Sequence, residues 1–153
     1  MWVPPEDNDP VVLHAPTRKS IACFGAVQVR TGRLVIVFSP VFDAATFECF
    51  LHQLLRHRSA RRTMHLVLDN ARYHHARVLQ PYLEQHRRHL ALDYLPPYSP
   101  QLNPIERVWK LTRRLCTHNR HFPTLDLLID AVETRFDLWQ EPNGTLRTLC
   151  GIN

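Results

Sequence analysis

Asp69 and Glu106 are the residues whose type and place in this sequence best suit metal chemistry. Asp69 ends a short apolar run, MHLVLDN at 64–70, and ligand sites of open α/β sheets lie beyond the carboxyl ends of parallel strands. Glu106 follows after one expected helix and one expected strand, a crossover that brings a strand end and a helix start to the same sheet edge. Two carboxylates converging there form a hard oxygen site for Mg²⁺ or Mn²⁺, ions that activate a nucleophile in phosphoryl transfer.

Both carboxylates also have purely structural interpretations. Asp69 and Asn70 can make turn hydrogen bonds before the next helix. Asn103 suits the N-cap of a helix, Pro104 its first position and Glu106 its third, which is the spacing of a capping box. The residues alone leave both interpretations open.

Four basic residues follow Glu106 along the next expected helix. Arg107, Lys110 and Arg114 are spaced i, i+3 and i+7 and so form a stripe, with Arg113 beside it. Such a stripe is either a solvated face or, beside a site that cuts phosphodiesters, a contact with the DNA backbone.

Histidines near the first carboxylate give a further candidate. His74 lies five residues past Asp69, and it either reaches the site or lies on the surface. Zinc is not expected, because neither His74-His75 nor the pair His118 and His121 has a cysteine at ligand spacing.

Composition limits the class of protein. The chain has 153 residues, 44% hydrophobic and 22% charged, which fits one globular domain with a core. Its net charge of +5 permits a polyanionic partner, and no apolar run approaches the roughly 18 residues of a membrane span, so no membrane partner is expected. The four cysteines form no CxxC pair, which favours a reduced, cytoplasmic protein.

The pattern of apolar residues predicts an α/β fold with a mixed sheet, in a single domain over 1–153. Asp43 is expected to cap the first helix, Thr124 to cap the last, and Pro81 to kink or split the second. Residues 1–19 are expected to be irregular, with PVVLHAP (10–16) as a short extended piece, and 141–153 to form a loose tail. The expected strands are 21–29 and 33–39 in a hairpin, 64–69 buried on both faces, and 90–96; the expected helices are 44–58, 74–88, 104–117 and one after 124.

Two stretches of the chain resemble a known family. LVLDNARYH at 66–74 and YLPPYSPQLNPIERVWK at 94–110 are similar to the signature of DDE transposases of bacterial insertion sequences related to the mariner superfamily. CFGAVQVRTGRLV and FDAATFECFLHQLL resemble the family's hairpin and first helix, and Trp2 with its prolines resembles the family's Trp segment. The resemblance covers about residues 2–118.

The resemblance implies an RNase H-like sheet flanked by helices, with three acidic ligands for Mg²⁺ or Mn²⁺. Asp69 would be the second ligand and Glu106 the third, with Asn70, His74 and Asn103 supporting them. The family cuts DNA at the element's ends and joins the freed 3′-hydroxyl to target DNA. The implied partner is therefore DNA, at element ends and target. A homodimer is a further possibility that the sequence leaves open.

The sequence departs from the family's pattern at its start. The family's first catalytic Asp lies on a central strand upstream of the Trp segment, and Glu6, Asp7 and Asp9 lie on the wrong side of Trp2. We therefore expect an N-terminally truncated copy that lacks this strand. Either PVVLHAP partly fills its place, or the missing N-terminal part of the transposase comes from a neighbouring reading frame.

Three functions follow from these expectations. The first is a transposase catalytic domain, and the second is a catalytically inactive remnant that at most binds DNA. The third is an RNase H-like nuclease outside transposition, which explains PPYSPQLNPIE less well.

Overall fold

The computed structural model describes residues 20–151 as an α/β protein, the expected fold class. The expectations placed on residues 1–19, including PVVLHAP and Trp2, lie outside the described residues. The strands are β1 (Ala22–Gln28), β2 (Arg33–Ser39), β3 (Met64–Leu68) and β4 (Leu90–Tyr94); the helices are α1 (Ala44–Leu55), α2 (Gln80–His86), α3 (Pro104–Thr112), α4 (Leu125–Asp137) and α5 (Gly144–Cys150). None of the helices in this part of the chain is long and apolar enough to cross a bilayer.

The four strands form two separate pairs. β1 and β2 make an antiparallel hairpin, in register from Ala22↔Ser39 to Gln28↔Arg33, and Gly32 supplies the positive φ of 77° that its turn requires. β3 and β4 pair in parallel. The expected single mixed sheet is not formed between residues 20 and 151, because β1 and β3 share no ladder.

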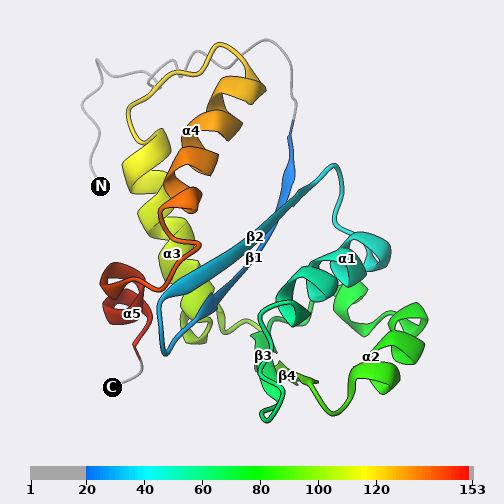
Figure 1. Cartoon of the computed structure of the whole chain (residues 1–153). Helices are drawn as coiled ribbons and strands as arrows, with labels where there is room; N and C mark the ends of the chain where they lie inside the picture. The colour runs from blue at the N-terminus through cyan, green and yellow to red at the C-terminus, as the bar shows by residue number, and fades with distance from the viewer. Residues whose placement is uncertain (1–19, 152–153) are drawn as a thin grey trace.

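The hairpin is covered on both faces. One core packs Phe24 with α1, α2 and the apolar residues of β3 and β4, and a second packs Leu34 with α3, α4 and α5. Figure 1 shows α3, α4 and α5 on one side of the hairpin and α1, α2 and the β3–β4 pair on the other. The hairpin therefore lies in the middle of the domain, between its two hydrophobic cores.

Local sequence rules account for two helix starts. Asp43 caps α1 in a reciprocal box, in which its Oδ1 accepts from Thr46 N at 2.8 Å and its own N–H donates to Thr46 Oγ1 at 3.1 Å. Thr124 Oγ1 accepts from Leu127 N at 3.3 Å and begins α4. Both caps were predicted from the sequence.

The expectation that Pro81 kinks or splits the helix over 74–88 is confirmed: the segment is two 3₁₀ turns, Arg72–His75 and Arg77–Leu79, followed by the short α2, whose first turn holds Pro81. Two other sequence-based expectations were wrong. β3 is not buried on both faces: Val67 is 42% exposed and His65 is exposed as well. The expected loose tail contains α5, where Asn143 Oδ1 accepts from Leu146 N at 2.9 Å.

Candidate active site

His74 fixes Asp69 at the carboxyl end of β3. The Asp69 side chain is 68% exposed, whereas that of His74 is 8% exposed. His74 Nδ1 lies 3.0 Å from the main-chain oxygen of Asp69 and 3.2 Å from its Oδ1. Since a carbonyl oxygen only accepts, Nδ1 carries the proton and donates it. Burial lowers the pKa of His74, which keeps the ring neutral at pH 7.

The turn after β3 holds the carboxylate in one orientation. Asp69 Oδ1 also accepts from the backbone N–H of Ala71 at 3.1 Å. Asn70 Nδ2 donates to the main-chain oxygen of Leu95 at 2.6 Å, and Leu95 N donates to Leu68 O at 2.9 Å. The ends of β3 and β4 are thus tied together, and the turn interpretation of Asp69 and Asn70 is confirmed as one of their roles.

Glu106 lies in the first turn of α3 without acting as a cap. Asn103 caps this helix, since its Oδ1 accepts from Ile105 N at 3.4 Å. The N–H of Asn103, which a capping-box glutamate would accept, instead donates to Pro100 O at 3.0 Å. The capping-box interpretation of Glu106 is therefore wrong. Its exposed carboxylate is free of that hydrogen bond and can bind a ligand.

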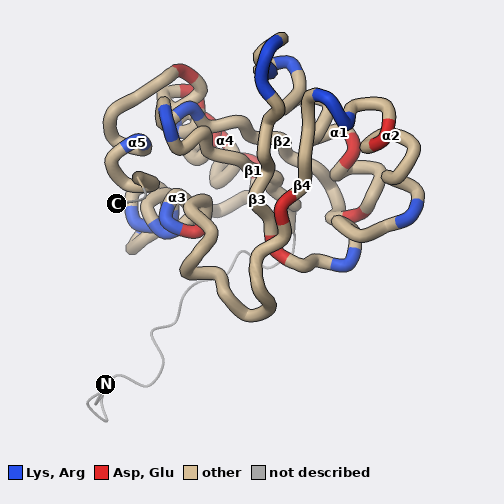
Figure 2. Tube along the Cα trace, turned by 90° about the horizontal axis from the view of Figure 1, so that it is seen from below, with Lys and Arg blue, Asp and Glu red and all other residues tan. Residues whose placement is uncertain are grey.

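Asp69 and Glu106 line one pocket. Its volume is about 220 Å³, and the Pro-rich loop Leu95–Pro100 forms its wall together with Asn70 and Asn103. Figure 2 shows acidic positions at the end of β3 and at the start of α3, on either side of this uncharged loop. The amides of Asn70 and Asn103 are engaged in hydrogen bonds that hold the fold, and the charged oxygen donors that line the pocket are the two carboxylates.

The pocket has the donor chemistry of a hard cation site. Carboxylate oxygens suit Mg²⁺ and Mn²⁺, and no sulfur or imidazole nitrogen lines the pocket. Between residues 20 and 151, however, no group of three His, Cys, Asp or Glu side chains lies close enough to hold a metal ion. The described residues thus offer two acidic ligands at most.

The basic stripe of α3 is divided between two roles. Lys110 on α3 and Arg113 and Arg114 in the π-helical turn Arg113–Thr117 that continues it are exposed, and Figure 2 shows positive charge here after the acidic start of α3. Arg107 instead donates to the main-chain oxygens of Leu149 at 3.1 Å and Gly151 at 3.3 Å. Its guanidinium therefore fastens the end of α5, a role that the spacing of the stripe did not indicate.

Sequence reasoning missed one residue of this pocket. Tyr98 is fully exposed and has a φ of 57°, a left-handed conformation that is rare for an aromatic residue. It lies in the loop that lines the pocket beside Asp69 and Glu106. The only signal in the sequence was an aromatic residue in a loop rich in proline, PPYSP.

A family model described as DDE superfamily endonuclease matches residues 1–129. The chain belongs to this family. The DDE endonuclease chain is 34% identical over 104 residues to the transposable element Tc3 transposase of Caenorhabditis elegans, and 28% identical over 108 residues to an insertion element IS630 39 kDa protein of Shigella sonnei. These matches cover 67% and 71% of the chain but only 30% and 31% of the two relatives.

A third relative has a more similar length. The uncharacterized protein y4pE/y4sA of Sinorhizobium fredii is 32% identical over 106 residues, which are 69% of this chain and 75% of that protein. Together with the family match, the IS630 and Tc3 relatives identify a DDE transposase of the mariner and IS630 type, as the resemblance implied.

Proposed function

We propose that this domain binds Mg²⁺ or Mn²⁺ through Asp69 and Glu106 and cleaves and joins DNA in the transposition of an insertion sequence. The observation that carries the proposal is the shared pocket: a strand-end and a helix-start carboxylate line it, and neither serves as a helix cap. When bound, the cation would activate the attacking oxygen and stabilise the leaving one.

The chain's own residues orient and surround the cation site. His74 Nδ1, 3.2 Å from Oδ1, and the N–H of Ala71 fix the Asp69 carboxylate, and the first turn of α3 carries Glu106. Both ligands are thereby presented in set positions, which lowers the cost of organising them when the ion binds.

DNA is the proposed partner, at the element's ends and at the target. Lys110, Arg113 and Arg114 supply positive charge next to the pocket for phosphate contacts, which fix the position of a duplex without reading its sequence. The exposed ring of Tyr98 suits stacking on an unpaired base. We assign these roles as part of the same proposal.

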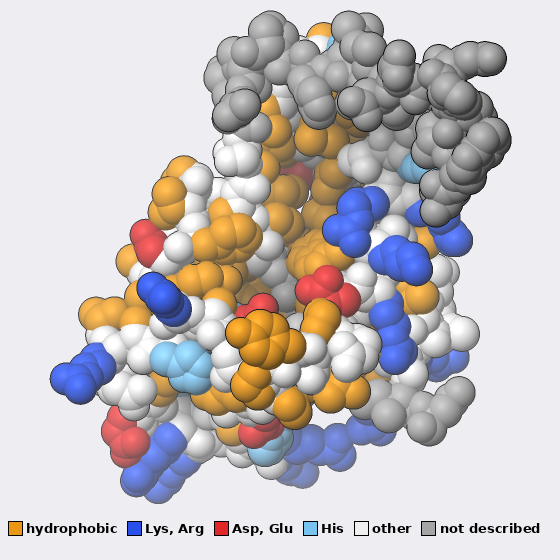
Figure 3. Space-filling view, turned by 180° about the vertical axis from the view of Figure 1, so that it is seen from behind, with side chains coloured by type: hydrophobic (Ala, Val, Ile, Leu, Met, Phe, Trp, Pro, Cys, Tyr) orange, Lys and Arg blue, Asp and Glu red, His pale blue; other side chains and the backbone are white. Residues whose placement is uncertain are grey.

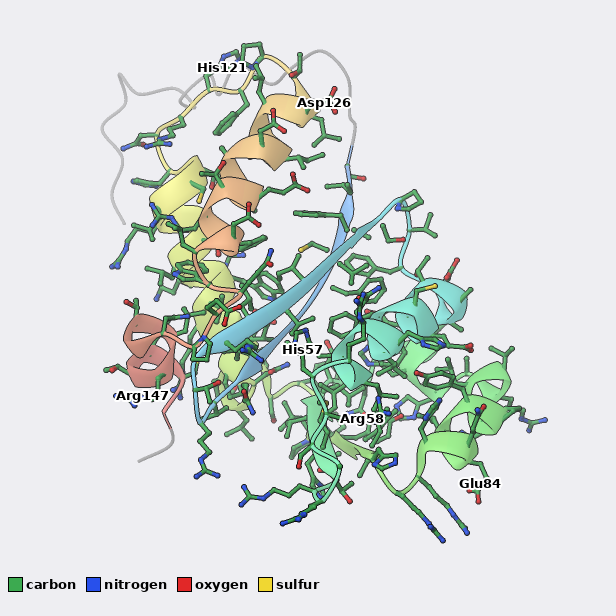
Figure 4. The ribbon with its side chains drawn as sticks, viewed as in Figure 1. His57, Arg58, Glu84, His121, Asp126 and Arg147 are labelled. Atoms are coloured by element: carbon green, nitrogen blue, oxygen red, sulfur yellow. The ribbon has the colours of Figure 1, made fainter. Side chains whose placement is uncertain are left out.

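The test is metal-dependent nicking of a supercoiled plasmid that carries the DNA flanking this gene. We expect nicking with Mn²⁺ or Mg²⁺ that stops in chelator and falls at least a hundredfold in Asp69→Ala and in Glu106→Ala. Glu84→Ala is the matched control, because this carboxylate projects from α2, pairs with Arg87 at the surface, and lies away from the pocket (Figure 4).

One observation favours a second candidate, a domain that binds DNA without cutting it. The part of the chain that the structure describes holds no third acidic ligand beside the first two. If the intact protein retards plasmid DNA but does not nick it with either ion, the binding function is correct and the endonuclease proposal fails.

A further inference from the structure

The C-terminal helix α5 contacts the turn of α3 that carries Glu106. It lies outside the stretch that the family model matches, residues 1–129, so the family match assigns it no role. Figure 1 shows α5 beside α3, next to the end of the β1–β2 hairpin where its turn lies. Each part of α5 makes contacts that fix its place between the hairpin and α3.

The start of α5 is fixed to the hairpin turn. The N–H of Asn143 donates to Thr31 O at 2.9 Å, and its Nδ2 donates to Gly32 O at 2.8 Å. The same side chain caps the helix, because its Oδ1 accepts from Leu146 N at 2.9 Å. The approach is so close that a Cβ at Gly32 would collide with the main-chain oxygen of Asn143. Asn143 therefore ties α5 to the turn through both its side chain and its main chain.

The middle of α5 belongs to the same hydrophobic core as α3. Leu146 and Cys150 are 0% exposed, and they pack in one cluster with Val108 of α3 and Leu34 of β2. Protein interiors are close-packed, so fully buried side chains have little room to shift. α5 therefore has a fixed place relative to both the hairpin and α3.

Arg107 joins the end of α5 to the first turns of α3. Its Nη1 donates to Leu149 O at 3.1 Å and to Gly151 O at 3.3 Å. The last carbonyls of a helix have no partner within the helix, and a cation beside them is favoured by the helix dipole. The guanidinium therefore stabilises the end of α5 and is itself held there, in the residue next to Glu106.

Cys150 makes a second contact with the same part of α3. Its thiol donates to Pro104 O at 3.6 Å, a weak hydrogen bond. Pro104 is the first residue of α3, so Pro104 and Arg107 lie on either side of Glu106 in the sequence. The backbone that carries Glu106 is therefore attached to α5 both before and after this residue.

The cap of α3 holds its first turn less firmly. Asn103 Oδ1 accepts from Ile105 N at 3.4 Å, which is long for a hydrogen bond, and Glu106 N donates to Asn103 O at 3.1 Å. The Glu106 side chain is exposed, and the space-filling view shows acidic side chains at the rim of a hollow (Figure 3). The backbone of this turn thus sets where the carboxylate lies, and α5 sets where the turn lies.

We propose that α5 positions Glu106 for the cation, with Arg107, Cys150 and Asn143 as the positioning residues. Ligands of a functional site must be held to within about 0.5 Å, and packed neighbours supply that precision. Arg107 does not line the pocket, so it acts through the backbone of α3 and not on the ion. The binding of the ion by Glu106 rests on the proposed function, whereas the ordering of the turn by α5 does not.

The first measurement needs no metal. It is amide hydrogen exchange, followed by NMR, at Glu106, whose N–H donates to Asn103 O within the turn. Arg107→Met keeps an apolar stem and removes the charged hydrogen bonds to α5, so it should speed exchange at Glu106 by at least about tenfold. The amide of Leu95, which ties β4 to β3, should exchange as in the wild type.

The second measurement is the Mn²⁺ concentration that half-broadens the amide signal of Ala71, next to Asp69. It should rise about tenfold in Arg107→Met, the low end of the loss expected when the support of a metal ligand is removed. Thr124→Ala is the control for stability, since it removes the N-cap of α4 and should lower Tm without changing the Mn²⁺ titration. Arg147→Met is the control for charge, since Arg147 is exposed on α5 (Figure 4).

Asn143→Ala tests the same claim from the far end of α5, should Arg107→Met fail to fold. It removes the hydrogen bonds to Gly32 O and Leu146 N and should also speed exchange at Glu106. Unchanged exchange at Glu106 in the folded variant, or faster exchange with an unchanged Mn²⁺ titration, overturns the proposal. So does an equal weakening of Mn²⁺ binding in Thr124→Ala, which would reduce α5 to a source of general stability. Faster exchange at Glu106 in a protein whose wild type binds no Mn²⁺ would support the ordering of the turn by α5 and contradict the proposed function.

Discussion

The two strand pairs of this domain differ in how completely the fold covers them. The β1–β2 hairpin has a packed core on each face, with Phe24 in one and Leu34 in the other. The β3–β4 pair contributes to only one of these cores, and His65 and Val67 on its other side are exposed. Yet this less covered pair carries Asp69 and ends beside the pocket.

The difference in burial suggests that the β1–β2 hairpin mainly stabilises the domain, whereas the β3–β4 pair carries the candidate site. A strand pair that is buried on both faces stabilises the domain, whereas the exposed face of β3 leads to the pocket that holds Asp69.

The largest effect is expected from a cavity in the hairpin. Leu34 is 1% exposed and Val67 is 42% exposed, so Leu34→Ala should lower the free energy of unfolding by about 2–5 kcal/mol and Val67→Ala by about 1 kcal/mol or less. Urea unfolding followed by circular dichroism measures both. Equal losses in the two variants would show that the contrast between the strand pairs is wrong.

Substitution of Tyr98 tests whether the loop that follows β4 contacts DNA. Loss of a stacking ring costs about 1–3 kcal/mol per base, so Tyr98→Asn should weaken binding of single-stranded DNA by roughly 5- to 150-fold. Asparagine tolerates the left-handed conformation, so stability should hold, and Tyr98→Phe, which keeps the ring, should bind normally. Fluorescence anisotropy gives the affinities, and unchanged binding by Tyr98→Asn would remove Tyr98 from the DNA surface.

A methyl group at Gly25 tests the packing of α3 on the hairpin. A Cβ there would lie 2.7 Å from Trp109 Cζ2 and 2.8 Å from Ile36 Cδ1, so Gly25→Ala should destabilise the fold by about 1–3 kcal/mol. Gly144→Ala is the matched control, since nothing lies within 4 Å of its Cβ, and it should leave stability unchanged or raise it by about 0.4–1 kcal/mol. Thermal unfolding measures the stability of both variants, and equal stability of Gly25→Ala and Gly144→Ala would contradict close packing of α3 at Gly25.

Much of the fold could be predicted from local signals. The hairpin, α1, β4 and the start of α4 follow from apolar periodicity and the caps at Asp43 and Thr124. Local signals did not predict the separation of the two strand pairs, because it depends on which edges meet in three dimensions; the expectation that the chain lacks the family's central strand did point to it. α5 was missed although Asn143 precedes a short stripe of Leu146, Leu149 and Cys150, since a seven-residue helix gives little periodicity.

The candidate site, like the fold, could be predicted only in part from the sequence. The spacing of Asp69 and Glu106 predicted their convergence on one pocket, which the structure shows. The contact of His74 with Asp69 and the hydrogen bonds of Arg107 to the end of α5 depend on tertiary packing, so sequence patterns left both open.

His74 should make the stability of the β3 end depend on pH. Burial lowers its pKa in the folded state, so below about pH 6.5 the unfolded chain binds a proton that the folded chain does not. Stability contributed by His74 is therefore present above that pH and is lost as the pH falls toward the folded pKa, with a slope of at most about 1.4 kcal/mol per pH unit. His74→Asn should flatten urea-derived stability between pH 7.5 and 5.5; an unchanged slope would contradict a neutral buried ring.

The central claim is that Asp69 and Glu106 hold one cation together, and paramagnetic broadening by Mn²⁺ tests it most directly. In NMR spectra of the wild type we expect low Mn²⁺ to broaden the amide signals of Ala71, next to the first carboxylate, and of Arg107, next to the second. Either Asp69→Asn or Glu106→Gln should reduce the broadening at both places, because one ion needs both ligands. Broadening that each substitution removes only around its own residue, or that neither changes, would contradict a shared cation site.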